Sequence, residues 1–494
     1  MAGLAEDSLM LYPSLYNETN HTDINTLANA RVSNGADVMS PIITRAYGKE
    51  SDWFPLVLLT EGKGRMKPVE SLDGKYKVPI MGKPKQSSVI VACEYTSADT
   101  TIGAGKSSGF ITFRDNWFSR DQDIQNGGRI MNKYTLKLLT DGVKVGTGWR
   151  YEFRLIGANP NAVIPFYELA VGKKWSRHAA VVGLLASRGN AHKTQAPAQF
   201  QNQTNLLRKS IQYKGNVQNK VMNLQIKMGD TPTNYWVDYE KYMCDLEFKR
   251  EQENVLWWET YNADANGVIH DRDINSGEIA PRGAGVVQQM VNKTTHSGRL
   301  TATKLRDVIQ AIFYNVSPGT KKDIVLFTGV GGRRLFQQAM AEESANIPVT
   351  TSNSFFIRDP ENNVTKLEYG AYFGSYVTED GHRITIKLMD SLDRGGKAEA
   401  CDRYKGLPVC SYDMYFLDMS TVEGEPNIQF VYEKGREETE NVELGVGNSA
   451  PRGLGINTKV VSTDKDASAI HYMRSLGVYI KNPTTCLAMT CELI

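Results

Sequence analysis

The chain has 494 residues, of which 41% are hydrophobic and 23% are charged, and its formal net charge is +2. This composition is typical of a folded protein rather than a disordered or collagen-like one, and the length suggests about three domains. No run of 18 or more apolar residues occurs, and the start lacks the basic and apolar segments of a secretory signal, so we expect neither a spanning helix nor a leader.

The six cysteines are scattered at positions 93, 244, 401, 410, 486 and 491, and no CxxC motif occurs. They are too few for a disulfide framework in a chain of this length, which favours a reducing compartment. Cys486 and Cys491 lie close together, but no nearby histidine or cysteine completes a zinc set. The seven histidines form no HxH or HExxH pattern and no GxSxG occurs, so we expect no catalytic residue, metal or cofactor.

Residues 1–60 are rich in Asn, Thr, Ser and Ala and show little periodicity, which predicts an arm that lies against another surface. The region 61–156 begins with a stretch dense in Gly, Pro and Lys. From 89 to 156 it reads as extended chain, in which β-rich segments such as SSVIVACEYT alternate with Gly-rich turns. These strands contain few apolar residues, and we expect them to build no core of their own. We therefore interpret this region as a long β-hairpin excursion.

The motif GAGKSSG at 103–109 looks like a phosphate-binding loop, which requires GxxxxGK[ST] between a buried strand and a helix. Thr100 stands where the first glycine is needed, and the β-prone SSGFITF follows in place of a helix. We interpret the motif as the flexible tip of a β-hairpin, because glycine adopts turn conformations freely.

Residues 157–232 form a basic segment or insertion, within which SRHAAVVGLLAS at 176–187 predicts a helix. No acidic residue occurs from Leu169 to Gly229, and ten basic residues do: Lys173, Lys174, Arg177, Arg188, Lys193, Arg208, Lys209, Lys214, Lys220 and Lys227. The next segment, from Asp238 to Glu278, holds eleven acids against four bases. Either the two segments neutralise each other, within or between subunits, or the basic one faces a polyanion such as nucleic acid.

Residues 233–299 open with a long helix, predicted from Asn234 to Tyr261 by apolar and aromatic residues that repeat at intervals of three or four. The segment NADANGVIHDRD follows it and resembles a calcium loop, with Asn262, Asp264, Asn266, Gly267 and Asp273 at ligand or glycine positions. Two of these ligand positions carry unusual residues and no exiting helix is evident. An Asx-Gly turn that ends the long helix is the alternative that we favour.

Residues 300–404 read as an α/β set: a helix in TATKLRDVIQAIFYNV, the strand DIVLFTG, the helix RRLFQQAMAEES, and a hairpin formed by AYFGSYV and HRITIKLMD. The cluster TGVGGRRLF at 328–336 follows a strand and opens a helix, as nucleotide sites do, but Arg334 replaces the last glycine of GxGxxG. We interpret it as a tight strand-to-helix turn. Two strands follow in residues 405–440, SYDMYFLDM and NIQFVYE, before a C-terminal segment at 441–494.

The order of these parts resembles the major capsid proteins of tailed bacteriophages. The stretch KKDIVLFTGVGGRRLFQQAM is similar to the strand, turn and helix of their axial domain, and GLPVCSYDMYFLDMS with NIQFVYEKGRE is similar to their peripheral-domain strands. The likeness spans nearly the whole chain and is closest to the capsid proteins of crAss-like phages. It implies an α+β fold with an N-arm, an extended β E-loop, a peripheral domain with a long spine helix and an axial α/β domain.

The resemblance also implies a function: a structural protein that self-assembles into hexamers and pentamers of an icosahedral shell around double-stranded DNA. Its partners would be copies of itself, portal, scaffold or decoration proteins and the packaged DNA, with assembly in the host cytoplasm and no membrane. The E-loop tip, with Gly103, Gly105, Lys106 and Gly109, would lie on an adjacent subunit, and the ten basic residues would face DNA. Another virion component, such as a portal or tail-tube protein, or a nucleotide-binding enzyme are the alternatives.

Overall fold

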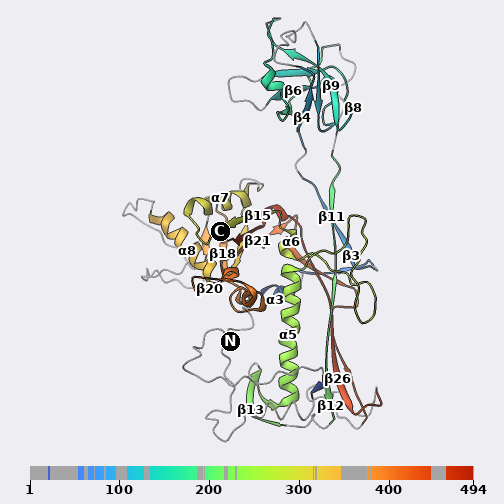
Figure 1. The fold of residues 1–494 in the computed structure, drawn as a ribbon, viewed down its shortest axis with the longest axis vertical. Coiled ribbons are helices and arrows are strands. Elements are labelled where there is room, and N and C mark those ends of the chain that lie inside the picture. Colours follow the sequence, from blue (N-terminus) through green and yellow to red (C-terminus); the bar gives the residue numbers. More distant parts are fainter. Residues whose placement is uncertain are drawn as a thin grey trace. The chain divides into compact units, whose positions relative to one another are not determined.

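The chain folds as two units, seen in a computed structural model that describes residues 21–22, 54–60, 65–71, 73–82, 85–95, 108–126, 134–159, 161–185, 193, 195–215, 221–228, 231–314, 316, 320–345, 375–377, 381–446 and 463–492. One unit comprises residues 1–78 and 200–494, and the other comprises residues 79–199 (Figure 1). The chain leaves the first unit along β3 (Lys75–Ile80) and returns along β11 (Ala198–Gln203), and these two strands pair with each other. No helix in the described ranges is both long and apolar enough to cross a bilayer.

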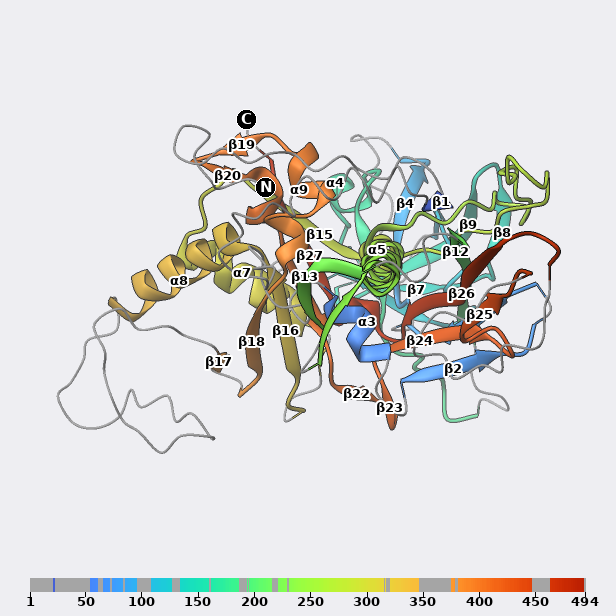
Figure 2. The same ribbon diagram turned by 90° about the horizontal axis from the view of Figure 1, so that it is seen from below.

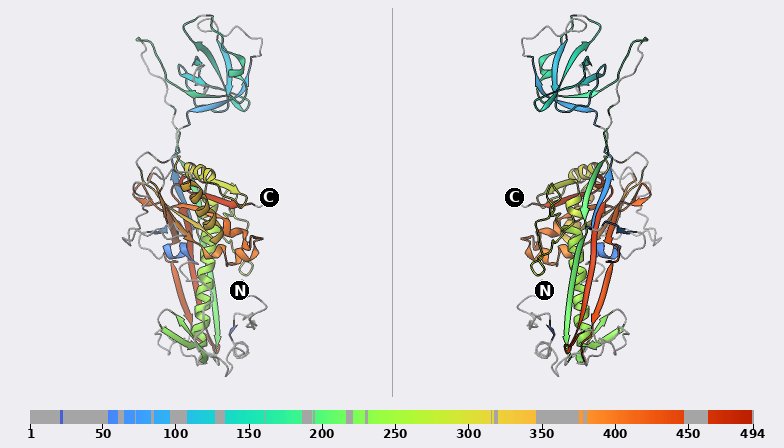
Figure 3. Two further views of the ribbon diagram at one scale, coloured as in Figure 1. Left: turned by 90° about the vertical axis from the view of Figure 1, so that its left-hand side faces the viewer. Right: turned by 90° about the vertical axis from the view of Figure 1, so that its right-hand side faces the viewer.

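In the unit of residues 79–199, six antiparallel strands close into a barrel. Each of β4, β10, β6, β7, β9 and β5 pairs with the next, and β5 pairs back with β4, while β8 adds to β9 beside the ring. Figure 3 shows these strands curving around a common centre. The elements are β4 (Ser87–Cys93), β5 (Gly109–Phe113), β6 (Asp123–Asn126), β7 (Thr135–Leu138), β8 (Val143–Val145), β9 (Gly148–Ile156), α4 (Phe166–Leu169) and β10 (Lys174–Arg177).

The barrel has a hydrophobic core of its own, so the expectation that these strands could not build one is wrong. Tyr151, Phe153 and Leu155 alternate along β9 and are all buried, as the two-residue period of a strand requires. The rings of Phe113 and Phe118 meet Tyr151 edge-on at centroid distances of 5.9 and 6.0 Å. Each strand supplies only one to three buried apolar side chains, but closure of the ring brings them together in one core. Because β10 completes the ring, the boundary expected at 156–157 falls inside this unit.

The helix predicted at 176–187 is also wrong in its described part. Trp175 and its neighbours form β10, which pairs with β4 on one side and with β6 on the other. Residues 178–185 contain no helix. Pairing with a strand on each side satisfies the backbone hydrogen bonds of β10. The stabilisation from this pairing outweighs the weak helix propensity of the sequence. The β-branched pair Val181–Val182 and Gly183 lower that preference further.

The other unit contains two six-stranded sheets. In the first, the order is β1, β12, β26, β24 and β2, and β25 also pairs with β26. The strand β26 is 14 residues long, and its residues Ala467–Leu476 pair antiparallel with all of β12. The strands are β1 (His21–Thr22), β12 (Asn205–Lys214), β26 (Ala467–Ile480), β24 (Ile428–Glu433), β2 (Met66–Val69) and β25 (Glu438–Glu443).

The second sheet carries the α/β set that the sequence predicts. Its order is β15, β27, β21, β16, β18 and β17, and the helices α7 and α8 cover one face. The predicted helix periodicity of α7 is confirmed, since Leu305, Val308 and Ile312 are buried against this sheet. The elements are β15 (Asn292–His296), β27 (Leu487–Cys491), β21 (Met414–Asp418), β16 (Asp323–Thr328), β18 (Arg383–Leu388), β17 (Ser375–Val377), α7 (Ala302–Phe313) and α8 (Val330–Ala345).

The predicted long helix is confirmed as α5, which spans Trp236–Trp258 and is shorter at both ends than expected. Figure 2 looks along α5 and shows it between the two sheets. Leu256 and Trp257 of α5 share one core with Phe430 of β24 and Tyr415 of β21, so the helix joins the inner faces of both sheets. The helix therefore serves as the central packing element of this unit.

Smaller elements complete the unit. They are α3 (Pro55–Thr60), α6 (Val286–Gln289), α9 (Gly396–Ala400), the 3₁₀ turns at Asp390–Leu392, Val409–Tyr412 and Pro483–Thr485, and the hairpins β13 (Val221–Met228) with β14 (Thr231–Tyr235), β19 (Arg403–Tyr404) with β20 (Leu407–Pro408), and β22 (Thr421–Val422) with β23 (Glu425–Pro426). The short helix α3 was missed by sequence reasoning. Nearly all of the predicted N-arm lies outside the described residues.

Candidate functional site

The motif GAGKSSG connects two paired strands of the barrel. It lies between β4 and β5, which run antiparallel with Cys93 opposite Ile111. The interpretation as a hairpin connection is therefore confirmed, and the helix that a P-loop needs is replaced by β5. Gly103, Gly105 and Lys106 lie outside the described residues, so their predicted contact with an adjacent subunit stays a prediction.

Gly109, the fourth residue of the predicted loop tip, is instead the first residue of β5. A Cβ atom built on it would overlap the hydroxyl group of Tyr95 and lie 3.0 Å from the ring of Phe153. Tyr95 and Phe153 themselves pack edge to face, 6.0 Å between centroids. The glycine is thus required by close packing against two aromatic rings.

The second glycine cluster lies at the start of α8, where a protein carboxylate occupies the position that a phosphate would take. The backbone N–H of Val330 donates to both oxygens of Asp393, at 3.0 and 3.2 Å, and Gly331 N–H donates to Ser411 Oγ at 2.8 Å. A Cβ on Gly329 would lie 2.7 Å from the Cα of Ser411. The interpretation as a tight strand-to-helix turn is confirmed, because an internal anion already satisfies the helix N-terminus.

The segment that resembles a calcium loop is held together by its own hydrogen bonds. Asp264 Oδ1 accepts the N–H groups of Asn266 and Val268, and Asp273 Oδ1 accepts those of Asn275 and Ser276. These bonds lower the pKa of both carboxyl groups. The predicted Asx-Gly turn is confirmed, with Gly267 at φ +80°.

The predicted ligands of that loop do not converge. Asn262 turns away, since its Oδ1 accepts from Gln203 and from the N–H of Arg282. No group of three or more His, Cys, Asp or Glu side chains that could hold a metal ion occurs in the described part of the chain.

The ten basic residues are divided between the two units. Lys173, Lys174, Arg177 and Lys193 belong to the barrel unit, whereas Arg208, Lys209, Lys214 and Lys227 belong to the other. Arg188 and Lys220 lie outside the described residues, and Lys227 is described only by its place in β13. Lys193 is turned onto its own barrel, where Nζ donates to Asn116 Oδ1 at 2.8 Å and to the carbonyl oxygen of Phe118. Lys193 is therefore engaged within its own unit.

The strand β12 sorts its basic residues onto two faces. Leu207, Ile211 and Tyr213 pack on α5 in one small core, and Lys209 lies on the same face. The Nζ atom of Lys209 lies 2.9 Å from Glu247 and 2.7 Å from Glu251, both on α5. The acidic and basic segments therefore neutralise each other at Lys209, as one of the two alternatives requires.

The residues of β12 that alternate with Leu207, Lys209 and Ile211 point to the face of the strand that is turned away from α5. Arg208 and Lys214 are both exposed there. On the barrel, Lys173 and Lys174 are also exposed, next to and at the start of β10. Among the described side chains of the set, these four are exposed, as contact with a polyanion requires.

A buried carboxylate that sequence reasoning missed fastens α3 to α5. Glu253 is only 1% exposed, and its oxygens accept the N–H groups of Leu56 at 3.0 Å and Val57 at 2.8 Å and the indole N–H of Trp257 at 2.7 Å. Burial raises the pKa of Glu253 to about 7, although the three donors act to lower it. The apolar run PLVLLT with proline first is the only sequence signal for α3.

A second bond ties the end of α3 to the first sheet. The guanidinium group of Arg474, on β26, donates to Thr60 Oγ1 at 2.7 Å and also contacts Gln252 and Glu438. Phe54, Leu56 and Val57 are buried in the central core. The point where the N-terminal segment joins the folded unit is therefore fixed by hydrogen bonds and by apolar contacts together.

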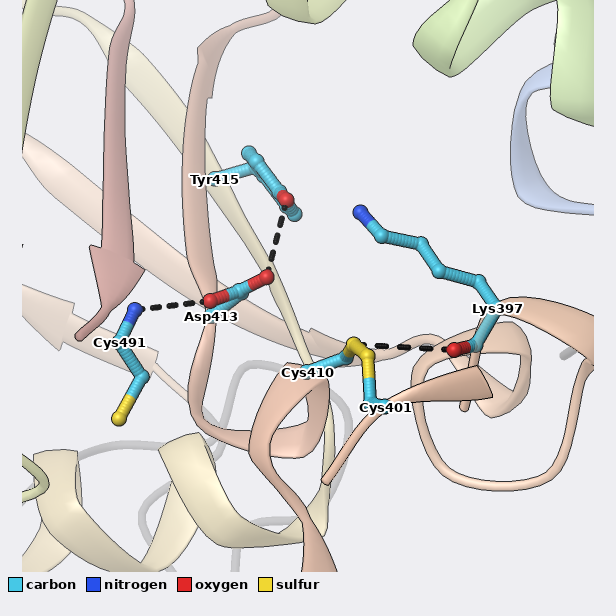
Figure 4. Close-up of a disulfide and its surroundings, with 6 residues drawn as sticks. All are labelled: Lys397, Cys401, Cys410, Asp413, Tyr415 and Cys491. Carbon is cyan, nitrogen blue, oxygen red and sulfur yellow. Dashed lines mark hydrogen bonds between the residues drawn. A yellow bond between two sulfur atoms is a disulfide. The ribbon is translucent and has the colours of Figure 1, made fainter. Parts of the chain in front are cut away.

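A disulfide joins Cys401 and Cys410, whose Cα atoms lie 6.3 Å apart (Figure 4). Their spacing in the sequence gave no indication of this pair. It closes the loop that contains β19 and β20, beside the buried carboxyl group of Asp413. Asp413 accepts the N–H of Cys491 at 2.9 Å and the hydroxyl of Tyr415 at 3.3 Å, and burial raises its pKa. These contacts fasten the C-terminal strand β27 to β21, which is a structural role.

Comparison with known proteins places the chain in a family. Residues 15–494 match the family model described as Crassvirus major capsid protein. The curated "Major capsid protein" of Bacteroides phage crAss001 is 24% identical over 431 residues, which are 83% of this chain and 82% of that protein.

Solved structures with similar chains include one from Microbacterium phage Oxtober96, with 10% identity, a TM-score of 0.35, and 94% of this chain and 98% of that chain covered. A capsid chain of an empty GTA particle covers the same shares with 6% identity and a TM-score of 0.34. Such scores support no argument about the fold, so the assignment rests on the sequence family.

Proposed function

Because the chain belongs to the Crassvirus major capsid protein family, we propose that its copies assemble into hexamers and pentamers that close an icosahedral shell around double-stranded DNA. The chain is the major capsid protein of a phage and a structural component of the virion shell. This family is a structural one and not a class of enzymes. The observation that carries the proposal is the family match over residues 15–494.

The two units correspond to the parts that such a shell protein needs. We assign the second sheet with α7 and α8 to the axial domain, and α5 with the first sheet to the peripheral domain and its spine helix. The barrel of residues 79–199 takes the place of the extended E-loop, with the connection that holds Gly103, Gly105 and Lys106 at one end of its β4–β5 hairpin. The order of the elements along the chain supports this assignment.

Assembly is tested by expressing the chain and imaging the product by electron microscopy. The proposal expects closed shells with fivefold vertices, formed in the bacterial cytoplasm without any membrane fraction. The proposal would be refuted if the protein formed rings or tubes, or stayed monomeric at protein concentrations above about 10 µM, the order of magnitude at which a weak subunit contact forms.

We also propose that the four exposed basic residues contact packaged DNA through its phosphates. Such contacts are independent of base sequence, and each phosphate contact adds about 0.9 to the slope of log affinity against log salt. Arg208 is the sharper case, because it lies on the exposed face of β12, opposite to Lys209, which is held by two carboxylates; Lys214 shares the face of Arg208.

The variant Arg208→Gln/Lys214→Gln tests this contact. We expect filled shells of the variant to lose DNA at lower salt than wild-type shells, with a slope smaller by roughly 2 per subunit. The matched control is Lys144→Gln/Arg154→Gln, which removes the same charge from exposed barrel positions outside the basic set. Equal shifts in both variants would show only an effect of net charge, and would refute a specific role for β12.

A further inference from the structure

The disulfide between Cys401 and Cys410 is the only bonded pair among the six cysteines, all of which the structure describes. The other four are free thiols, and Cys244, Cys486 and Cys491 are buried. Proteins of the cytosol rarely keep a structural disulfide, because the thiol pools there are reducing. The cysteine content of the chain favours such a compartment, whereas one pair of sulfur atoms is joined. A bond that forms and breaks reversibly is consistent with both observations.

The loop between the two cysteines is folded by contacts that do not involve the bond. Its strands β19 and β20 pair antiparallel, and Lys405 and Gly406 connect them with φ values of +48° and +82°. Two consecutive residues with positive φ form the tight turn that suits a two-residue hairpin. Just inside the disulfide, the N–H of Val409 donates to the carbonyl oxygen of Asp402 at 2.7 Å. These contacts bring positions 401 and 410 together whether or not the sulfur atoms are joined.

The hairpin is also anchored on its surroundings. The ring of Tyr404 packs edge to face on Tyr412 with 5.4 Å between centroids, and the Tyr412 hydroxyl donates to the carbonyl oxygen of Tyr404 at 3.2 Å. A Cβ atom on Gly298 would lie 2.7 Å from the Tyr404 ring, so this ring also packs closely on the backbone of Gly298. Reduction therefore leaves the loop in place, and the two thiols stay close enough for the bond to form again.

The two cysteines differ in their exposure. Cys401 is half-buried, whereas Cys410 is only 5% exposed and its sulfur lies 3.8 Å from the carbonyl oxygen of Lys397 (Figure 4). A small thiol or disulfide in solution therefore reaches Cys401 first.

Thiol–disulfide exchange supplies the chemistry of both directions. In oxidation, the Cys401 thiolate attacks one sulfur of a low-molecular-weight disulfide such as oxidised glutathione, and one glutathione thiolate leaves. The Cys410 thiolate then attacks the Cys401 sulfur of this mixed disulfide and releases the second glutathione. The two protons that the cysteine thiols lose end on the two glutathione thiols. Reduction by two molecules of reduced glutathione runs the same steps in reverse.

The bond joins the end of α9 to the 3₁₀ turn Val409–Tyr412, which holds the start of α8. Ser411 Oγ in this turn accepts the N–H of Gly331 at 2.8 Å, and Thr328 Oγ1 donates to the carbonyl oxygen of Asp413, directly after the turn, at 2.7 Å. The bonded cysteines are separated by 9 positions in the sequence. Closing a loop of this length makes unfolding less favourable on the order of 100-fold.

We propose that Cys401 and Cys410 form a redox clasp, a dithiol while the subunit is inside the reducing bacterial cell and a disulfide in the released virion. Closing the clasp stabilises the second sheet and α8 at the stage when the protein is outside the cell. The timing rests on the proposed function, whereas the reversible chemistry rests on the loop between the two cysteines.

The state of the clasp can be measured on peptides of the purified full-length chain. The protein is equilibrated with reduced or with oxidised glutathione, its free thiols are blocked by alkylation, and it is digested with trypsin. Cleavage after Lys397, Arg403 and Lys405 places the two cysteines on separate peptides. We expect mass spectrometry to find these peptides joined after oxidation and alkylated separately after reduction. A link that persists in reduced glutathione, or no link in oxidised glutathione, would overturn the proposal.

Urea unfolding measures what the clasp does to stability. At one urea concentration, the unfolding equilibrium constant of oxidised wild-type protein should be on the order of 100-fold smaller than that of reduced protein. The variant Cys401→Ser should match reduced wild-type protein in both glutathione buffers. The control Cys93→Ser removes a free thiol from the other unit and should keep the wild-type response. Equal unfolding of oxidised and reduced wild-type protein, or a response that survives in Cys401→Ser, would contradict the clasp.

The role in the virion is tested on assembled shells. Oxidised wild-type shells should withstand more urea than reduced ones, and equal resistance would refute this role. If the protein forms no shells, the proposed function fails, while the peptide and urea measurements on free subunits still decide whether the clasp exists.

Discussion

Replacing Glu253 by glutamine should abolish a pH dependence in the attachment of α3. The carboxylate is buried in α5, and its hydrogen bonds to Leu56 and Val57 hold the start of α3. Glutamine has nearly the same shape but cannot ionise. The substitution therefore separates the titration of this side chain from its packing.

The size and sign of the effect follow from the pKa. In the folded protein the pKa of Glu253 is raised from the ordinary 4.5 to about 7, so the folded state holds the proton more tightly than an open state does. The stability of this attachment is then greatest below pH 4.5, and it falls as the pH rises from about 4.5 to about 7. The fall is worth ~3 kcal/mol, and above pH 7 no further change is expected.

Hydrogen–deuterium exchange of a peptide that covers residues 54–60 measures this opening directly, because release of α3 exposes Glu253 to water. After correction for intrinsic exchange, wild-type protection should fall by about two orders of magnitude from pH 5 to pH 7.5. The Glu253→Gln variant should show no such trend. The control Glu251→Gln removes the same charge at an α5 position that pairs with Lys209, and should keep the wild-type trend. Equal slopes in wild type and Glu253→Gln would refute this reasoning.

Three further predictions concern stability. Asp393→Ala removes the carboxylate that accepts from Val330 at the start of α8, and should lower stability by ~1–2 kcal/mol in chemical denaturation, whereas a change below ~0.5 kcal/mol would contradict the capping role. Gly332→Ala places a Cβ against Thr328 Oγ1 and should cost ~1–3 kcal/mol, while Gly396→Ala, with no neighbour within 4 Å, should be tolerated in the same melting experiment. Lys67 and Lys481 lower the pKa of Glu425 to about 2. The difference in melting temperature between wild type and Glu425→Gln should therefore be present above pH 4.5 and vanish as the pH falls toward 2. A difference that does not depend on pH would argue against the ion pairs.

Elements whose stability comes from local periodicity could be predicted from the sequence. The helix α7 shows this most clearly, since Leu305, Val308 and Ile312 repeat at helical spacing and are the residues that the structure buries. The strand β16 and helix α8 were predicted for the same reason. The long helix α5 was predicted with ends that differ by two or three residues, because capping and fraying shift helix ends within that range.

The barrel could not be predicted in this way because its closure depends on pairs that are distant in sequence. Trp175 of β10 lies opposite Ser88 of β4, and Phe113 of β5 lies opposite Trp149 of β9. Seen singly, each strand has too few apolar residues for a core. Only the pairing of all six strands brings those residues into one interior.

The candidate site was predictable in part for the same physical reason. Charge counting found the basic and acidic segments, but it could not tell Arg208 from Lys209, which differ only in the face of β12 that they occupy. That distinction comes from the packing of the strand on α5. The carboxylate of Glu253 gave no signal in the sequence, since two of its three partners lie 196 and 197 residues away.

Because β3 and β11 pair with each other, the barrel is connected to the rest of the chain as an inserted domain whose two ends lie side by side. Both ends of residues 79–199 meet at neighbouring strands, so a short hairpin turn could bridge the gap after excision. A recombination event that removes, exchanges or inserts a module at this point would leave the buried contacts of α5 untouched. Phage lineages could thus vary the module without redesigning the body of the subunit, and an engineer could graft a foreign domain with closely spaced termini at the same place.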